Sequence, residues 1–168
     1  MRIIDFKTYV EEFDNLVNAR NEQVIITNAE DCILVGENSY NEVSGLTAYK
    51  THKFGGCLVN FKEDVCLSEF TDKEIPTGKE WMLKLVNYLQ SKGLNAYLDG
   101  NDVLVDGFKV GSYMRANING CWNTACHISI GMDVDLIKQV CTKEMYKIPK
   151  GLKDYGITQQ EIIDLYNK

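Results

Sequence analysis

A short segment near the middle of the chain brings an amide, a carboxylate and an ammonium group close together in sequence. In residues 100–115 (GNDVLVDGFKVGSYMR), Asn101 and Asp102 begin one β-branched run, and Lys109 lies early in the next. Asp106-Gly107 stands between the runs and predicts a type I′ hairpin, whose turn needs positive φ at both central residues. The strands of such a hairpin would hold the three polar groups in one fixed geometry.

These groups suit chemistry on a phosphorylated substrate. A carboxylate such as that of Asp102 can hold Mg²⁺ beside a nucleoside triphosphate. An ammonium group such as that of Lys109 stabilises negative charge that develops on a phosphate and on neighbouring carboxyl oxygens. The alternative is a surface hairpin with a solvated lysine, which is the commoner arrangement when the hairpin is considered alone.

Length and charge limit the classes of function. The 168 residues, of net charge −6, predict a single domain over residues 1–168 with a substantial core. No run of lysine and arginine indicates a nucleic-acid partner or an anionic membrane surface. The sequence has neither a long apolar stretch nor a signal-peptide pattern, so we expect a cytoplasmic protein without a membrane partner.

The six cysteines contain no Cys-x-x-Cys pair. In the cytoplasm they are expected to remain thiols, most of them small buried hydrophobic residues. Only Cys121 and Cys126 lie close together in sequence, and no second pair accompanies them. The spacing therefore does not predict a structural zinc site.

Hydrophobic periodicity predicts an α+β fold. Thr77 and Glu80, and again Thr158 and Glu161, have the spacing of a capping box that opens a helix. Residues 62–64 are expected to join two strands as a hairpin. Tight turns between successive strands indicate a mixed, largely antiparallel sheet flanked by helices that pack on one face. The predicted helices cover residues 5–18, 77–92, 133–141 and a segment opened at Thr158; the predicted strands cover residues 23–27, 32–35, 57–61, 65–70, 94–98, 103–105, 108–110 and 125–130.

The order of these segments resembles the catalytic domain of lipoate–protein ligases, in the superfamily of biotin and lipoate ligases and octanoyltransferases. Residues 93–115 carry the closest match, to a helix, a "GRND" segment, a hairpin and a "K-[IV]-[SG]-G" pattern that ends near an arginine. Residues 28–41 (NAEDCILVGENSYN), 51–59 (THKFGGCLV) and 127–136 (HISIGMDVDL) are similar to three further family segments in the family's order. The similarity extends over residues 25–140.

The resemblance implies a two-step acyl transfer. Lipoate, octanoate or a related small acid would be activated by ATP and Mg²⁺ to acyl-AMP, and the acyl group would pass to a lysine of a lipoyl-type carrier domain. Lys109 would be the catalytic lysine, and Asn101 and Asp102 would position the nucleotide, with Asp102 as the Mg²⁺ ligand. The other residues implied to bind nucleotide or acid are Gly36, His52, Lys53, Gly55, Gly56 and His127.

The sequence departs from the family pattern where the family binds phosphate. The paired arginines are replaced in the segment Thr51-His52-Lys53, the third glycine is Cys57, and the arginine of "GRND" is absent before Asn101. Lysine does not reproduce the bidentate hydrogen bonds of a guanidinium group. His52 or Lys53 would have to replace the lost arginines, and the family's C-terminal accessory domain has no counterpart in these residues.

Two alternatives therefore stand beside the ligase hypothesis. The first is a binding protein that has kept the fold and pocket and lost turnover. The second is an ATP-independent octanoyl or lipoyl transferase that works through a cysteine thioester; Cys141 lies in the corresponding region with different spacing, and a buried thiol at a helix end is its ordinary interpretation. His127 can equally be a ligand-binding residue or an inward-facing histidine with no ligand.

Overall fold

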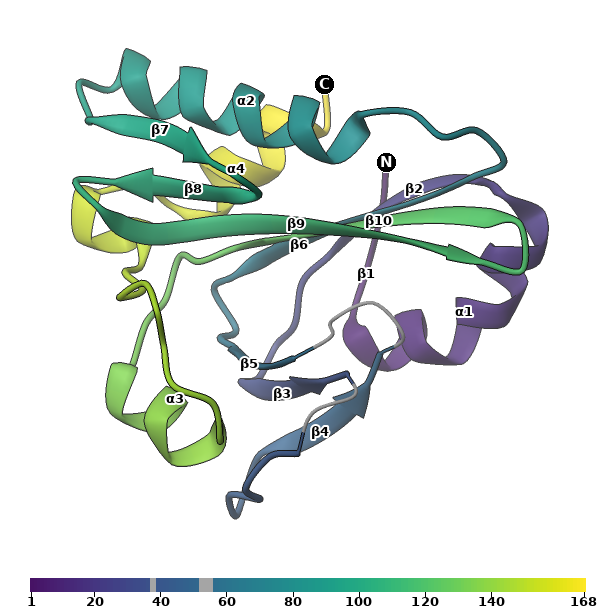
Figure 1. The fold of residues 1–168 in the computed structure, drawn as a ribbon, viewed down its shortest axis with the longest axis horizontal. Helices are drawn as coiled ribbons and strands as arrows, with labels where there is room; N and C mark the ends of the chain where they lie inside the picture. The colour runs from purple at the N-terminus through teal and green to yellow at the C-terminus, as the bar shows by residue number, and fades with distance from the viewer. Residues whose placement is uncertain (37–38, 52–55) are drawn as a thin grey trace.

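The computed structural model describes residues 1–36, 39–51 and 56–168 of the chain. In these residues two β-sheets and four α-helices form a layered α+β arrangement (Figure 1). The predictions for His52, Lys53 and Gly55 fall outside the described residues. Among the described helices, none is long and apolar enough to cross a membrane.

The larger sheet has seven strands, which are antiparallel to their neighbours except for the parallel pair at one edge. Their spatial order is β1 (Arg2–Ile4), β2 (Asn21–Ile26), β6 (Val65–Thr71), β10 (Cys121–Ile128), β9 (Phe108–Ile118), β8 (Asp102–Val105) and β7 (Ala96–Asp99). The smaller sheet has the order β4 (Thr47–Lys50), β3 (Cys32–Val35) and β5 (Cys57–Asn60).

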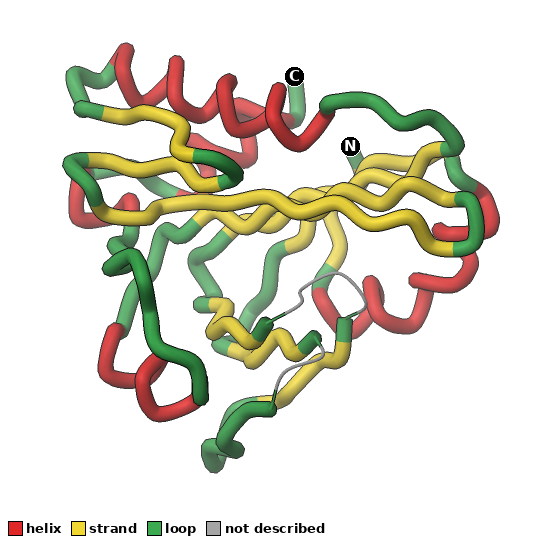
Figure 2. The backbone as a smooth tube through the Cα atoms, viewed as in Figure 1, coloured by secondary structure: helices red, strands yellow, loops and turns green. Residues whose placement is uncertain are grey.

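Helices cover both faces of the larger sheet, and the prediction that they pack on one face is wrong. Apolar side chains of α2 (Thr77–Ser91) and α4 (Gln159–Tyr166) bury one face. Those of α1 (Phe6–Ala19) bury the other, together with residues of β3. The smaller sheet packs in turn against α3 (Val134–Val140), so it forms a third layer on the α1 side (Figure 2). A 3₁₀ turn, η1 (Leu152–Tyr155), precedes α4.

The predicted hairpin is confirmed. Asp106 and Gly107 have φ values of 51° and 85°, as a type I′ turn requires, and join β8 to β9. β9 is longer than predicted because it continues to Ile118, where Asn119 and Gly120 form a second turn with positive φ into β10.

Two local predictions are wrong. β5 and β6 do not pair as a hairpin across residues 62–64, because β5 belongs to the smaller sheet and β6 to the larger one. Thr77 does not cap α2: Pro76 is the N-cap residue, and Thr77 is already inside the helix and buried. The capping box of Thr158 and Glu161 is present as predicted.

Candidate functional site

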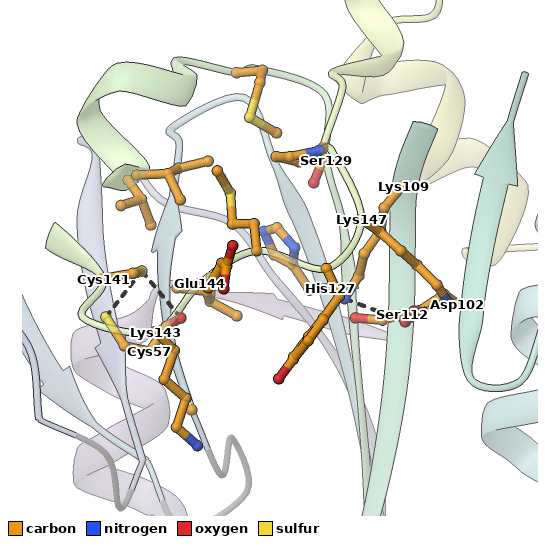
Figure 3. Close-up of a pocket in the computed structure, with 18 of the residues that line it drawn as sticks. Cys57, Asp102, Lys109, Ser112, His127, Ser129, Cys141, Lys143, Glu144 and Lys147 are labelled. Atoms are coloured by element: carbon orange, nitrogen blue, oxygen red, sulfur yellow. Dashed lines mark hydrogen bonds and ion pairs between the residues drawn. The ribbon is translucent and has the colours of Figure 1, made fainter. Parts of the chain in front are cut away.

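A cavity of about 510 Å³ lies between the two sheets and α3, and four of the residues implied by the resemblance line it. They are Lys109, Asp102, His127 and Gly56. The cavity has the size of a small-molecule pocket. Residues 142–147 and Pro149 also line it; they belong to residues 142–150, the segment between α3 and η1, which we call the covering segment (Figure 3).

The hairpin brings Asp102 and Lys109 together across neighbouring strands. A register shift places Leu104 opposite Lys109 and Asp102 opposite Ser112, three residues further along β9. Such a bulge re-aims side chains beside a site. The Lys109 ammonium Nζ lies 3.2 Å from Oδ1 of Asp102, so the carboxylate and the lysine expected to do chemistry form an ion pair in the pocket wall.

A second lysine completes this cluster. Lys147, on the covering segment, places its ammonium Nζ 2.7 Å from Oδ2 of Asp102 and 3.2 Å from a carboxylate oxygen of Asp99. The hydrogen bond that Lys147 donates to Asp102 is the main cause that raises the pKa of Lys147 above its ordinary value. Both lysines thus share the carboxylate of Asp102. We call Asp102, Lys109 and Lys147 the charged wall of the pocket.

The covering segment is tied to the hairpin by its backbone. The amide of Lys109 donates to the carbonyl of Ile148 at 2.9 Å, and the amide of Lys150 donates to the carbonyl of Lys109 at 2.9 Å. At its start, the hydroxyl of Thr142 donates to the carbonyl of Ser39 at 3.0 Å. These contacts fix Lys147 beside Asp102 although the residue lies outside any helix or strand.

His127 is held by a buried carboxylate. The side chain of Asp64 has no exposed area, and its Oδ2 lies 3.0 Å from Nε2 of His127. The same carboxylate accepts the backbone amides of Phe61, Ile130 and Gly131 at 2.7–3.0 Å. Both oxygens of the carboxylate thus act as acceptors, and the contact with His127 holds the ring through one nitrogen, Nε2. Nδ1 is then the ring nitrogen left for a ligand in the pocket.

Two thiols form the side of the pocket opposite the charged wall (Figure 3). In this view His127 lies between the thiols and the charged wall. The Sγ atoms of Cys57, on β5, and Cys141, at the end of α3, are 3.4 Å apart. Cys141 also directs its S–H at the carbonyl of Cys57, at 3.3 Å. Burial, followed by the contact with Cys141, raises the pKa of Cys57 to about 12, and burial also raises that of Cys141. We call this pair the thiol wall.

The remaining implied residues lie elsewhere. The side chain of Asn101 is not part of the lining of the pocket; the residue is exposed in the β7–β8 turn, and its carbonyl accepts the amide of Tyr113. Gly36 is not a lining residue either, and its amide donates to the carbonyl of Gly56, at 2.8 Å. The structure therefore places Asp102, Lys109, His127 and Gly56 in one pocket lining. Asn101 and Gly36 lie outside this lining, and Gly36 adjoins it through its hydrogen bond to Gly56.

Sequence reasoning missed Lys147, Asp64 and the pairing of Cys57 with Cys141. The available signal for Lys147 was the lysine-rich stretch 143–150, which has no hydrophobic periodicity. Asp64 stood in a stretch interpreted as a hairpin link. The two cysteines are 84 residues apart, and no local pattern connects them.

Asp102 is the residue that the resemblance implies as a Mg²⁺ ligand. In the described part of the chain, no three histidine, cysteine or acidic side chains lie close enough together to hold a metal ion. Mg²⁺ is commonly held by one or two carboxylates together with nucleotide phosphates. Asp102 fits this arrangement as a single protein ligand beside a bound nucleotide. It does not form a metal site by itself.

No protein-family model matches the sequence, and no curated protein matches it. Solved structures do match. LipL1 of P. falciparum in complex with lipoate has a TM-score of 0.75 at 16% identity, over 98% of this chain and 57% of that one. The bi-partite lipoate protein ligase of Thermoplasma acidophilum, studied with its E2 lipoyl domain, has a TM-score of 0.76 at 12% identity, over 98% and 79% of the two chains.

The biotin protein ligase of Aquifex aeolicus, in complex with biotin and ATP, has a TM-score of 0.60 at 11% identity, over 98% of this chain and 64% of that one. The chain thus spans between just over half and four fifths of the length of these three proteins. These likenesses extend over nearly the whole chain and agree with its mixed, mostly antiparallel sheets and four described helices. The chain has the α+β fold of lipoate–protein ligases and biotin ligases.

Proposed function

We propose that the chain is a lipoate–protein ligase-like enzyme that activates a small carboxylic acid with ATP and passes the acyl group to a carrier-protein lysine. The observation that carries the proposal is the charged wall: a carboxylate held between two ammonium groups, inside a pocket of ligand size. Proteins of this fold include one in complex with lipoate and one in complex with biotin and ATP.

The charged wall supports activation of a carboxyl group by a nucleotide. When the acid carboxylate attacks the α-phosphorus of ATP, negative charge grows on the phosphate oxygens and pyrophosphate leaves. Lys109 and Lys147 would stabilise this charge from fixed positions, which is the largest contribution that a polar site commonly makes to a rate. Their attraction to Asp102 keeps both ammonium groups in the pocket wall before the substrates bind.

Asp102 would hold the Mg²⁺ that accompanies the nucleotide, which shields the phosphate charge from the approaching carboxylate. Nδ1 of His127 would orient a hydroxyl or carboxyl group of the ligand. Gly56 has no side chain, so the backbone there can approach the adenylate closely. Lys147 takes over part of the phosphate binding that the missing arginines do in the family, although as a point charge it lacks their bidentate geometry.

The partner of the second step would be a lipoyl-type domain. One protein of this fold was studied with its E2 lipoyl domain. The carrier lysine would attack the activated carboxyl carbon and release AMP. Lipoate, octanoate and biotin remain the candidate acids, and the reaction itself can select among them.

The test is a reaction of the chain with Mg-ATP and a mixture of lipoate, octanoate and biotin, followed by mass spectrometry. We expect one acyl-adenylate from the wild type and a loss of about 100- to 1,000-fold in Lys109→Ala. Lys150→Ala is the matched control, because its ammonium group packs on the rings of Phe108 and Tyr155, outside the pocket lining. Absence of every adenylate, with binding of an acid or nucleotide detected by a shift in Tm, would instead establish the binding-protein alternative.

ATP-independent transfer is the second candidate, because Cys141 shares the pocket with Lys109. A thioester mechanism needs the thiolate of Cys141, whereas burial raises the pKa of this thiol and keeps it protonated near neutral pH. Incubation with an octanoylated carrier and no ATP separates the two candidates. An octanoyl group on Cys141 in the intact mass would favour the transferase; an unmodified thiol beside ATP-dependent adenylate would exclude it.

A further inference from the structure

The proposed activation of an acid by ATP does not use the thiol wall. Its two sulfur atoms are 3.4 Å apart, and both belong to the lining of the pocket. A disulfide bond is about 2 Å long, so a small movement of either side chain would join them. The other four cysteines are at most 1% exposed, whereas Cys57 and Cys141 are half-buried, so this is the accessible thiol pair.

Position gives the pair a defined reaction partner. The charged wall and the thiol wall lie on opposite sides of one pocket (Figure 3). An acid whose carboxylate binds Lys109 directs the far end of its chain away from the charged wall, towards the thiols. For octanoate that far end is inert. For lipoate it is a dithiolane, a cyclic disulfide that thiols can open.

We propose that Cys57 and Cys141 are a dithiol–disulfide exchange site for a dithiolane acid bound in the pocket. This inference rests on the proposed function for the way the acid is oriented. It also names the substrate class, because a straight-chain acid or biotin offers no disulfide for the pair to act on.

The exchange balances without another reactant. The thiolate of one cysteine attacks a ring sulfur, which forms a mixed disulfide and opens the ring to a thiolate. The second cysteine then attacks the sulfur of the first, which forms the Cys57–Cys141 disulfide and releases the acid's second thiolate. Two electrons pass from the protein to the acid, and the two cysteine protons go to the two released thiolates.

The structure also predicts the pace of this exchange. A thiolate is the attacking group, and both pKa values are raised, that of Cys57 to about 12. Exchange should therefore be slow at neutral pH and speed up as the pH rises towards the pKa. A disulfide between β5 and the end of α3 would join covalently two elements that now meet through side-chain packing and the contact of Cys141 with the carbonyl of Cys57.

The experiment leaves out ATP, so it does not depend on turnover. The reduced chain is incubated with an excess of lipoate, denatured in acid, and its remaining thiols are alkylated and counted by mass. We expect the number of alkylated thiols to fall from six, one for each cysteine of the chain, to four. After digestion, a disulfide-linked peptide should contain Cys57 and Cys141. Cys57→Ser and Cys141→Ser should each form no disulfide within the chain and lose at most one thiol, as a mixed disulfide with the acid, and Cys121→Ser, a buried cysteine, should still lose two.

Lipoamide provides the matched ligand, since it has the same dithiolane and no charge. We expect lipoate to oxidise the pair about tenfold faster than lipoamide, a difference of about 1.4 kcal/mol, and Lys109→Ala to remove the difference. Six alkylated thiols after lipoate treatment, in a chain with an unchanged Tm, would overturn the proposal; equal rates for the two ligands would overturn the acid-directed orientation. Octanoyl-adenylate formed by a chain with six unreactive thiols would leave the proposed function standing and reject only this inference.

Discussion

The charged wall and the thiol wall of the pocket differ in how the fold builds them. Asp102 and Lys109 lie on adjacent strands of one hairpin, so ladder hydrogen bonds and a tight turn fix their separation. Cys57 and Cys141 come from the smaller sheet and the end of a short helix, 84 residues apart, and meet through layer packing. Asp102 and Lys109 are therefore positioned by local structure, whereas Lys147 and the two thiols are positioned by the tertiary fold.

This difference has a chemical counterpart. The charged wall is ionised and internally paired, which suits charge stabilisation by groups that need not move. The thiol wall is neutral at physiological pH and close enough for a covalent bond, which suits a change of state. His127 lies between the two walls, and the carboxylate of Asp64 orients its ring. Variants that disturb one wall, or that remove Asp64 between the two walls, test whether a change in one wall affects the other.

The largest expected effect comes from Asp64→Ala, which removes the support between the two walls. The backbone amides of Phe61, Ile130 and Gly131 would lose their acceptor in a buried place. Each buried donor left unpaired costs about 1–3 kcal/mol, so the free energy of unfolding should fall by about 3 kcal/mol or more. Urea unfolding measures this loss.

Asp31→Ala is the control for this change, since Asp31 accepts one amide, that of Lys62, at an exposed position. Its cost should stay near 1 kcal/mol. If the two variants were equally stable, Asp64 would not be the support that the hydrogen bonds indicate, and the two walls would have to be held by other contacts.

Gly151→Ala should disturb the charged wall more than the thiol wall. A Cβ at this position would overlap the carbonyl oxygen of Ile130 and lie 3.0 Å from the carbonyl carbon of Gly131, so backbone would have to move. Such overpacking costs about 1–3 kcal/mol. The covering segment would shift and draw Lys147 away from Asp102.

The readouts for Gly151→Ala are Tm and the rate of adenylate formation, with disulfide formation between Cys57 and Cys141 measured alongside. We expect the first two to fall and the third to remain. Lys153→Ala, which breaks an exposed ion pair with Glu63, should change the free energy of unfolding by less than about 1 kcal/mol. Equal loss at both walls would mean that they form one cooperative unit.

Lys147→Ala tests the charged wall alone. The variant removes one of two cations that face the proposed phosphate position, and we expect kcat for adenylate formation to fall about tenfold, that is about 1.4 kcal/mol. Stability should change little, because the ammonium group is partly exposed in its ion pairs. Lys147→Arg should recover part of the rate, since it keeps the charge, whereas an unchanged kcat in Lys147→Ala would remove this lysine from the proposed mechanism.

The distinction between groups positioned by local structure and groups positioned by tertiary packing also explains what the sequence could predict. The β8–β9 hairpin, with Asp102 and Lys109 beside each other, followed from Asp106-Gly107, whose conformational requirement is local. The capping box at Thr158 was also predicted correctly, but the similar pattern at Thr77 was not, because the helix already begins at that residue. Local patterns locate an element but leave its ends open, by one residue at the start of α2 and by eight at the end of β9.

Features that depend on tertiary packing were beyond these patterns. The strands β1 and β4 are short and pair in parallel with partners more than ten residues away, so no hairpin turn marks them. The chain changes sheets between β5 and β6 at a link that contains Asp64, whose carboxylate binds the distant amides of Ile130 and Gly131. For the same reason the covering segment, with Lys147, is positioned by Lys109 and by no pattern of its own.

The smallest expected effect is a difference between the two walls in how they make folding stability depend on pH. The pKa of Cys57 is about 12 in the folded chain against an ordinary value of 9.0, so above pH 9.0 the unfolded chain loses this proton and the folded chain keeps it. Folding stability should therefore fall from about pH 9.0 upwards and be unaffected below it.

The charged wall behaves differently in this range, because the raised pKa of Lys147 keeps its ion pairs intact beyond its ordinary value of 10.5. We expect Cys57→Ser to flatten the decline in Tm between these two pH values, with no effect near neutral pH. A decline of equal slope in the wild type and the variant would show that the thiol wall carries no proton linkage, and would place the alkaline sensitivity elsewhere in the fold.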